Sequence, residues 1–274
     1  MRLSLGITPK SYFSLAAAND ADAQAFITAA GITDATQKSA VNQLVLDLKS
    51  ANIWTKMKAI YPIVGGTAST HKYNLKDPRD LDAAFRLIFA TGMTHSSTGM
   101  LGNGTSGFAN TMFNTQTNFS SNNACISFYN RTNIGSVSGV IYGNSDNVTT
   151  YLPLTQCYPN LSGNTTSDMQ DFNYRISVAN SDRRGMYIST RSANNNFKLF
   201  KNNALFGSNT GIQPQTNFPN SNLTIDAFNY NGTTGNYLAC EISFFSMSTS
   251  LTDAEALSLY NAVQTYQTTL ARNI

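Results

Sequence analysis

Three tyrosines, Tyr151, Tyr158 and Tyr230, lie in segments rich in asparagine, a combination that suits the binding of carbohydrate. The face of an aromatic ring can stack on a sugar ring, while asparagine amides form hydrogen bonds with sugar hydroxyls. The same residue types are also ordinary components of strands and cores. The three tyrosines are therefore a hypothesis for glycan contact, and the sequence assigns no catalytic, cofactor-binding or metal-binding residue.

The carboxylates of the chain form no pattern that indicates glycoside hydrolysis. That reaction needs two positioned carboxyl groups, about 5 to 9.5 Å apart. Glu241 and Glu255 are the only glutamates, and Glu255 is better explained as a helix cap. Asp168 with Asp171, or Asp226 alone, stay open as alternatives. The sequence thus predicts a protein that is not an enzyme, with a polysaccharide depolymerase as the third hypothesis.

Metal-dependent and nucleophilic chemistry also lack a motif. His71 and His95 are the only histidines, and neither has a cysteine or a carboxylate at the spacing of metal ligands. The glycine-rich run from Gly99 to Gly104 lacks the lysine of a phosphate-binding loop. A calcium site built from Asp and Asn oxygens stays open, because these residues occur throughout the chain. No cofactor is predicted.

The composition points to a folded β protein with few charges. Of 274 residues, 41% are hydrophobic and 11% aromatic, which is enough for a core, whereas only 12% are charged. A net charge of +3 is too small to indicate a nucleic-acid or membrane partner. The N-terminus is a poor match to a signal peptide, and no segment approaches the roughly 20 apolar residues of a membrane span.

Three cysteines, Cys125, Cys157 and Cys240, cannot all pair within one chain. We therefore expect buried free thiols, which agrees with synthesis in a reducing compartment such as a bacterial cytoplasm.

Hydrophobic residues recur at every second position in many short segments, which predicts short strands without intervening helices. The clearest is the run from Phe172 to Val178, where Phe, Tyr, Ile and Val alternate with polar residues, so that one face should be core and the other wet. Such strands predict an antiparallel sandwich rather than a parallel α/β sheet. The predicted strands are 85–89, 124–129, 139–142, 172–178, 186–189, 197–200, 223–230 and 237–245.

Helical patterns lie near both ends of the chain, within one globular domain. Residues 1–18 are predicted to be an extended N-terminal arm, 19–60 a helical segment packed on the sandwich, 61–250 the β-sandwich and 251–274 a C-terminal helix. The helix caps expected here are Asn19 or Asp20, Asp34 and the capping box of Thr252 with Glu255. A helical signal from Trp54 onward is expected to end near Tyr61.

Three segments resemble the concanavalin A-like and laminin-G-like superfamily. These are the hairpin-like stretch 186–205, the strand 237–246, and the closing helix signature from Ser250 to Tyr260. The resemblance implies an all-β jelly roll with N-terminal helices and a C-terminal helix. It says almost nothing about activity.

Residues 26–107 resemble sequences from structural proteins of phages that infect Bacteroidota, the crAss-like phages among them. The runs that carry this resemblance are 31–45, 53–62 and 76–86. It implies a structural component of a tailed-phage virion, such as a head fibre, a capsid decoration or a tail-associated protein. The expected partners are then other virion proteins and further copies of the chain in a homo-oligomer. The alternative is a carbohydrate-binding module that attaches to host surface glycans.

Overall fold

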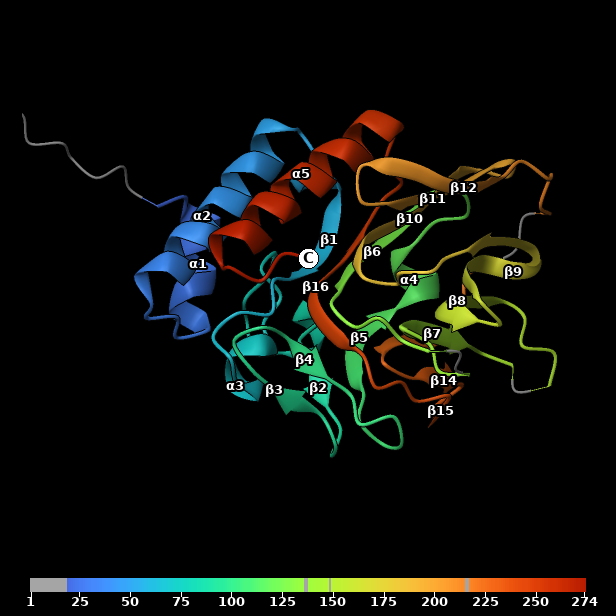
Figure 1. The fold of residues 1–274 in the computed structure, drawn as a ribbon, viewed down its shortest axis with the longest axis horizontal. Coiled ribbons are helices and arrows are strands. Elements are labelled where there is room, and N and C mark those ends of the chain that lie inside the picture. Colours follow the sequence, from blue (N-terminus) through green and yellow to red (C-terminus); the bar gives the residue numbers. More distant parts are fainter. Residues whose placement is uncertain (1–18, 136–137, 148, 215–216) are drawn as a thin grey trace, which may run out of the picture.

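The computed structural model describes residues 19–135, 138–147, 149–214 and 217–274. The predicted arm, 1–18, lies outside these residues. The described chain forms three layers, in which a helical layer covers one β-sheet and a second β-sheet packs on the other side of the first (Figure 1). The antiparallel sandwich predicted from the sequence is confirmed.

The helical layer contains α1 (Ala21–Ala29), α2 (Ala35–Ser50) and α5 (Asp253–Thr269). Each begins where the sequence places a cap, because the capping side chain accepts a hydrogen bond from a backbone N–H of the first turn. Asp20 caps α1, Asp34 caps α2, and Thr252 with Glu255 forms the predicted capping box of α5.

The first sheet has the strand order β12-β11-β10-β6-β16-β4-β3, and β1 also pairs with β16. Its strands are β1 (Met57–Tyr61), β3 (Thr94–His95), β4 (Met100–Leu101), β6 (Ala124–Asn130), β10 (Gly185–Ala193), β11 (Asn196–Lys201), β12 (Ala204–Asn209) and β16 (Glu241–Ser248). In β6 the side chains alternate between two cores, since Cys125 and Tyr129 face the helices while Ile126 and Phe128 face the second sheet.

The second sheet has the order β15-β14-β7-β13-β5-β2, and β8 joins β7 to β9. Its strands are β2 (Ile88–Phe89), β5 (Ala109–Asn114), β7 (Tyr142–Ser145), β8 (Leu154–Leu161), β9 (Asn164–Ala179), β13 (Asn222–Ile225), β14 (Phe228–Tyr230) and β15 (Thr233–Gly235). The pairing of β14 with β7 is parallel, and the other described pairs of strands are antiparallel. Short helical turns complete the chain: Trp54–Lys56, Ala68–His71, Asp82–Ala84 and Thr115–Asn118.

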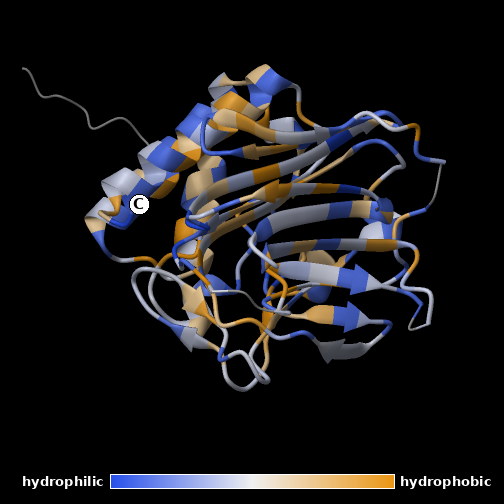
Figure 2. Cartoon of the chain, turned by 45° about the vertical axis from the view of Figure 1, so that its right-hand side comes forward, coloured by the Kyte–Doolittle hydropathy of each residue, from blue (hydrophilic) through white to orange (hydrophobic). Residues whose placement is uncertain are grey.

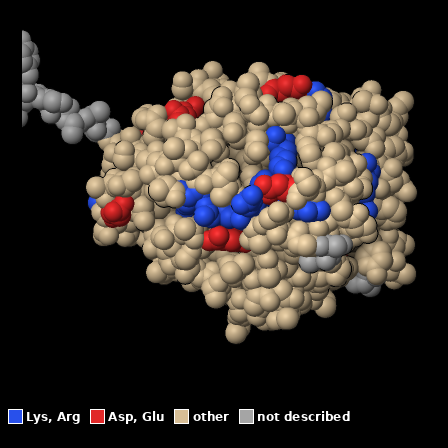
Figure 3. Space-filling view, viewed as in Figure 1, with Lys and Arg blue, Asp and Glu red and all other residues tan. Residues whose placement is uncertain are grey.

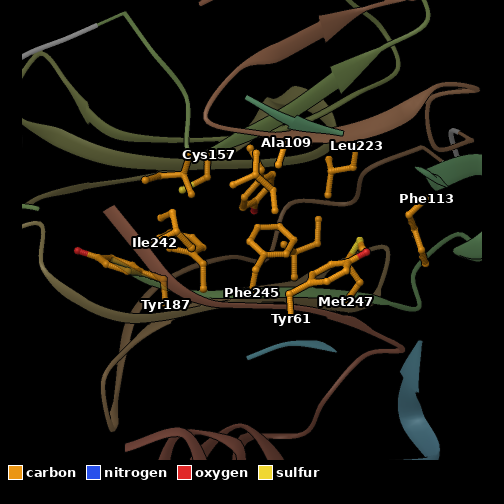
Figure 4. Packing of buried hydrophobic residues seen from close by; sticks show 14 of the residues in the cluster. Tyr61, Ala109, Phe113, Cys157, Tyr187, Leu223, Ile242, Phe245 and Met247 are labelled. Atoms are coloured by element: carbon orange, nitrogen blue, oxygen red, sulfur yellow. The ribbon is translucent and has the colours of Figure 1, made fainter. Parts of the chain in front are cut away.

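The core between the sheets is apolar and rich in aromatic residues. Tyr61, Phe245 and Met247 of the first sheet meet Cys157 and Leu223 of the second across this space (Figure 4). Coloured by hydropathy, the strands carry apolar and polar residues side by side, as the period of two requires (Figure 2). The three cysteines are buried and free, as predicted.

The helical segment predicted for 19–60 is wrong at its end. Helix α2 ends at Ser50, and Met57–Tyr61 is a strand that pairs with β16. Met57 and Ile60 pack under the helices, whereas Ala59 and Tyr61 enter the core between the sheets. An apolar run that is buried on both faces has no polar face, so its periodicity does not separate a strand from a helix.

Several predicted strands have different limits. The strand predicted at 237–245 begins only at Glu241 and continues to Ser248. The prediction for 223–230 is interrupted by Asp226, whose φ of 61° turns the chain between β13 and β14. The prediction for 85–89 shortens to Ile88–Phe89, because Phe85 takes a left-handed conformation with φ of 59°. The prediction for 139–142 meets the strand only at Tyr142, where β7 begins. The left-handed conformations of Asp226 and Phe85 interrupt the predicted strands, and such a conformation is uncommon for phenylalanine.

Candidate functional site

The outer face of the second sheet carries a cavity of about 290 Å³ with aromatic walls, which we call the aromatic cavity. Strand β8 builds one wall, because its alternate side chains Leu154, Gln156 and Tyr158 line the cavity while Cys157 points into the core. Leu154 belongs to a small apolar cluster that is separate from both main cores.

Strand β14 builds the opposite wall with Phe228 and Tyr230, whose ring centroids lie 4.4 Å apart. Phe228 packs against Gly143 of β7, its partner in the parallel pairing. A Cβ at Gly143 would overlap the Phe228 ring. The glycine therefore lets the aromatic side chain lie flat against the sheet.

The structure brings together all three tyrosines that the sequence analysis singled out. Tyr151, Tyr158 and Tyr230 line the same cavity, although they come from a loop, from β8 and from β14. The rings of Tyr151 and Tyr230 meet edge to face, with centroids 5.8 Å apart and an interplanar angle of 68°. Tyr151 is 46% exposed and forms the rim, while the other two are partly buried.

Five further residues of the cavity were not assigned to a site from the sequence: Leu154, Gln156, Phe172, Phe228 and Asn236. Phe172 was expected to face the core at the start of the alternating run 172–178, yet its side chain is 40% exposed. Gln170, two residues earlier, has φ of 74°, which changes the direction of β9 before Phe172. The composition of the run gives no signal for this bend.

Tyr158 and Tyr230 are neutral hydrogen-bonding groups at physiological pH. Burial raises the pKa of Tyr230 to about 12, and the neighbouring Tyr158 and Tyr151 add to this effect. Burial also raises the pKa of Tyr158, against a smaller opposing contribution from its hydrogen bond with Asn236. Both hydroxyls can thus donate as well as accept a hydrogen bond.

A buried ion pair supports the wall of the cavity. Arg175 donates two hydrogen bonds to Asp168, of 2.8 and 2.6 Å, and its guanidinium carbon lies 6.0 Å from the centroid of Tyr158. The amide of Gln156 donates to the same carboxylate at 2.7 Å, so that the amide oxygen of Gln156 is turned away from this contact. Burial raises the pKa of Asp168, and Arg175 opposes this by stabilising the charged form.

The carboxylates considered for catalysis are held in structural contacts. Asp168 pairs with Arg175, Asp171 accepts hydrogen bonds from Asn173, and the fully buried Asp226 accepts one from the backbone of Gly102. Glu241 contacts Arg131 and Thr98, while Glu255 caps α5 and pairs with Lys56. Among the described residues that line the aromatic cavity, none is a carboxylate.

The two histidines meet although they are 24 positions apart, with 3.0 Å between their Nδ1 atoms. The sequence analysis treated them as unrelated. Within the described ranges, no group of three or more potential metal ligands surrounds them.

A second cavity, of about 380 Å³, lies beside the aromatic cavity, and we call it the asparagine cavity. Strands β5, β13 and β14 supply its walls, with Asn110, Asn222 and Asn229 among the lining side chains. Asn231 and Thr234 extend it onto the β14–β15 hairpin. None of these asparagines was assigned to a site from the sequence, and the fold brings them together.

Charged side chains occupy a small part of the visible surface. Figure 3 shows Lys and Arg side chains in a band across one face, with Asp and Glu side chains beside them, surrounded by a largely uncharged surface. Most basic side chains with a described partner are in ion pairs, such as Arg184 with Asp182 and Lys198 with Asp253. None of the helices in the described part of the chain is long and apolar enough to cross a membrane.

No protein-family model and no curated protein matches the sequence, but solved structures share its fold. Domain 4 of AbnA, a GH43 extracellular arabinanase from Geobacillus stearothermophilus, in complex with arabinotriose, is 12% identical, with a TM-score of 0.50 over 74% of this chain and 98% of that chain. The Ruminococcus gnavus IT-sialidase CBM40 bound to α2,3-sialyllactose is 12% identical, with a TM-score of 0.41 over 50% of this chain and 82% of that chain. The K499G mutant of the NanB sialidase from Streptococcus pneumoniae is 14% identical, with a TM-score of 0.42 over 51% of this chain and 24% of that chain.

This chain thus spans about a quarter of the sialidase, 24% of its length. At such identities the likeness to Domain 4 of AbnA shows the fold, a mostly β sandwich of two sheets.

Proposed function

We propose that this protein is a carbohydrate-binding module that holds a sugar in the aromatic cavity. The fold it shares with Domain 4 of AbnA, a domain whose structure contains arabinotriose, supports this proposal. The proposal extends the hypothesis that Tyr151, Tyr158 and Tyr230 contact a glycan.

The observation that carries the proposal is the convergence of these three tyrosines on one cavity. Tyr151 and Tyr230 meet edge to face at its rim, so a sugar ring can rest on one aromatic face and be bordered by the other. The amides of Gln156 and Asn236 lie in the same cavity and offer partners for sugar hydroxyls. A mostly apolar pocket with a few convergent polar groups is the usual form of a small-molecule site.

A glycan array probed with the purified protein tests this proposal, followed by calorimetry on the glycans that bind. Tyr151→Ala should lower the affinity at least about tenfold, because an aromatic contact contributes on the order of 1 kcal/mol beyond its buried area. Tyr151 is exposed, so its replacement should leave the fold intact.

Leu257→Ala is the matched control for this substitution. Leu257 is 45% exposed, close to the 46% of Tyr151, but it lies on α5 in the helical layer. The control should bind like the wild type. An array without any bound glycan, or equal affinities for Tyr151→Ala and Leu257→Ala, would contradict the proposal.

A place in a phage particle stays a prediction that depends on the resemblance of residues 26–107. We propose that such a particle would carry the domain as a surface component, where glycan binding and assembly could coexist. Mass spectrometry of purified particles tests the location, and light scattering of the purified chain tests the predicted homo-oligomer. A chain that is monomeric and absent from particles would contradict this second proposal.

A further inference from the structure

We infer that the asparagine cavity is a second sugar subsite, so that the protein binds a neutral oligosaccharide that extends across β14 from one cavity to the other. This inference depends on the proposed function, because it takes the aromatic cavity as the first subsite.

The first argument is the position of the two cavities on either side of one short hairpin. Strand β14 supplies Phe228 and Tyr230 to the aromatic cavity and the intervening Asn229 to the asparagine cavity. The alternation continues along the hairpin, where Thr234 lines the second cavity and Asn236 the first. The two cavities therefore share this hairpin as a common wall. Both open on the outer face of the second sheet, because the lining residues of β8, β5 and β13 alternate with residues that face the core.

The second argument is that some amides of the asparagine cavity are free to bind a ligand. The side chain of Asn231 has no hydrogen-bond partner among the described residues, although it lines the cavity. The oxygen of Asn110 accepts a hydrogen bond from the backbone of Met112 at 2.9 Å, while its NH2 group has no described partner. By contrast, Asn229 is held at both ends by backbone groups, Asn222 O and Gly232 N.

The third argument concerns the charge of the ligand. No charged side chain is among the described residues that line either cavity. Arg175, whose guanidinium lies over the Tyr158 ring, is already engaged by both oxygens of Asp168. An anionic sugar would lose its hydration without gaining an ion pair, whereas the hydroxyls of a neutral sugar match amide donors and acceptors. The ligand class that fits both cavities is therefore a neutral oligosaccharide.

Calorimetry with oligosaccharides of increasing length tests this inference. The probes are linear arabino-oligosaccharides and xylo-oligosaccharides from the disaccharide upward, with oligogalacturonides as the anionic series. For the wild type, affinity for a neutral series should rise with length once the chain reaches the second cavity, and the oligogalacturonides should bind more weakly at every length.

Asn231→Gly isolates the second cavity. Asn231 has φ of 48°, and glycine accepts this conformation without strain while it removes the amide. The variant should bind long neutral oligosaccharides about three- to tenfold more weakly, the value of one hydrogen bond, and short ones unchanged. Asn110→Asp should act in the same way, because it keeps an acceptor for Met112 but loses the NH2 donor.

Asn52→Gly is the matched control for Asn231→Gly. Asn52 is also exposed, has φ of 58° and makes no described side-chain hydrogen bond, but it follows α2 in the helical layer. This control should keep the full gain of affinity with length.

The outcomes separate the inference from the proposed function. The inference is overturned if affinity does not rise with oligosaccharide length, if Asn231→Gly binds like Asn52→Gly, or if only anionic glycans bind. In each of these cases a loss of affinity in Tyr151→Ala still supports the aromatic subsite. If Tyr151→Ala leaves affinity unchanged, the proposed function fails and the inference fails with it.

Discussion

Acid should destabilise this protein through one buried histidine. His71 is 1% exposed, and its Nε2 accepts a hydrogen bond from the backbone N–H of Gly66 at 3.1 Å. Its proton therefore resides on Nδ1, which donates to Nδ1 of His95 at 3.0 Å. Burial lowers the pKa of His71 to about 3, and the neighbouring His95 and Arg272 contribute to the same shift.

The sign and size of the effect follow from this pKa. The unfolded chain binds a proton at His71 below about pH 6.5, whereas the folded chain stays neutral there until about pH 3, so stability is lost as the pH falls through this window. Between pH 7 and pH 5 the loss from His71 alone is about 2 kcal/mol. That is between about an eighth and two fifths of a typical stability of 5 to 15 kcal/mol.

Urea unfolding at pH 7, 6 and 5 measures this loss. The chain has only two histidines, and buried acids such as Asp226 titrate alike in the wild type and in a histidine variant, so the comparison of the two isolates the histidine. His71→Gln should be less stable than the wild type at pH 7 but should lose less stability between pH 7 and pH 5, by about 2 kcal/mol. His95→Gln is the comparison. Burial lowers the pKa of His95 too, but this ring is less buried than that of His71, so the His95→Gln variant should keep most of the acid sensitivity of the wild type. Parallel stability curves for the wild type and His71→Gln would refute the reasoning.

Three other substitutions have expected outcomes that unfolding experiments can check, together with a measurement of glycan binding for one of them. Burial raises the pKa of Asp226 well above its usual value, so the contribution of this carboxyl group to stability falls as the pH rises from about 4. One of its carboxylate oxygens also has no described partner, and Asp226→Asn should therefore stabilise the fold at pH 7 by about 1 kcal/mol or more. A lower melting temperature of this variant would contradict the expectation. Gly143→Ala should displace the Phe228 ring and weaken glycan binding more than it lowers the melting temperature, and unchanged binding would show that the ring can move without cost. Thr252→Ala should cost about 1 kcal/mol, because it removes the cap of α5, whereas Thr265→Ala, in the same helix, should cost less.

The features of this fold that are best predicted from the sequence are the helix starts, where a residue type has a single local role as a cap. Asp20, Asp34 and Thr252 cap the helices at the predicted positions, because a short polar side chain satisfies N–H groups that the helix leaves free. Met57–Tyr61 was predicted as helix, because a strand between two cores shows the same continuous apolar pattern as a buried helix.

The candidate site could be predicted only in part. Tyr151, Tyr158 and Tyr230 were singled out for their chemistry, but only the pairing of β8 and β14 with β7 brings them together. Phe172 was assigned to the core, because the bend at Gln170 that exposes it has no signature in the residue types. The asparagine cavity was missed for a different reason: asparagine is so common in this chain that a cluster can be recognised only in three dimensions.

The order of the three layers gives the molecule two different ends, and this determines how it can be attached to a surface. Residue 19, where the described chain begins, and Ile274 both lie beside the helical layer, and the C mark in Figure 1 stands next to α5. The two cavities lie on the outer face of the far sheet. A tether at Ile274 would therefore hold the helices toward the support and present the cavities to the surroundings, so a C-terminal tag can immobilise the protein without masking them.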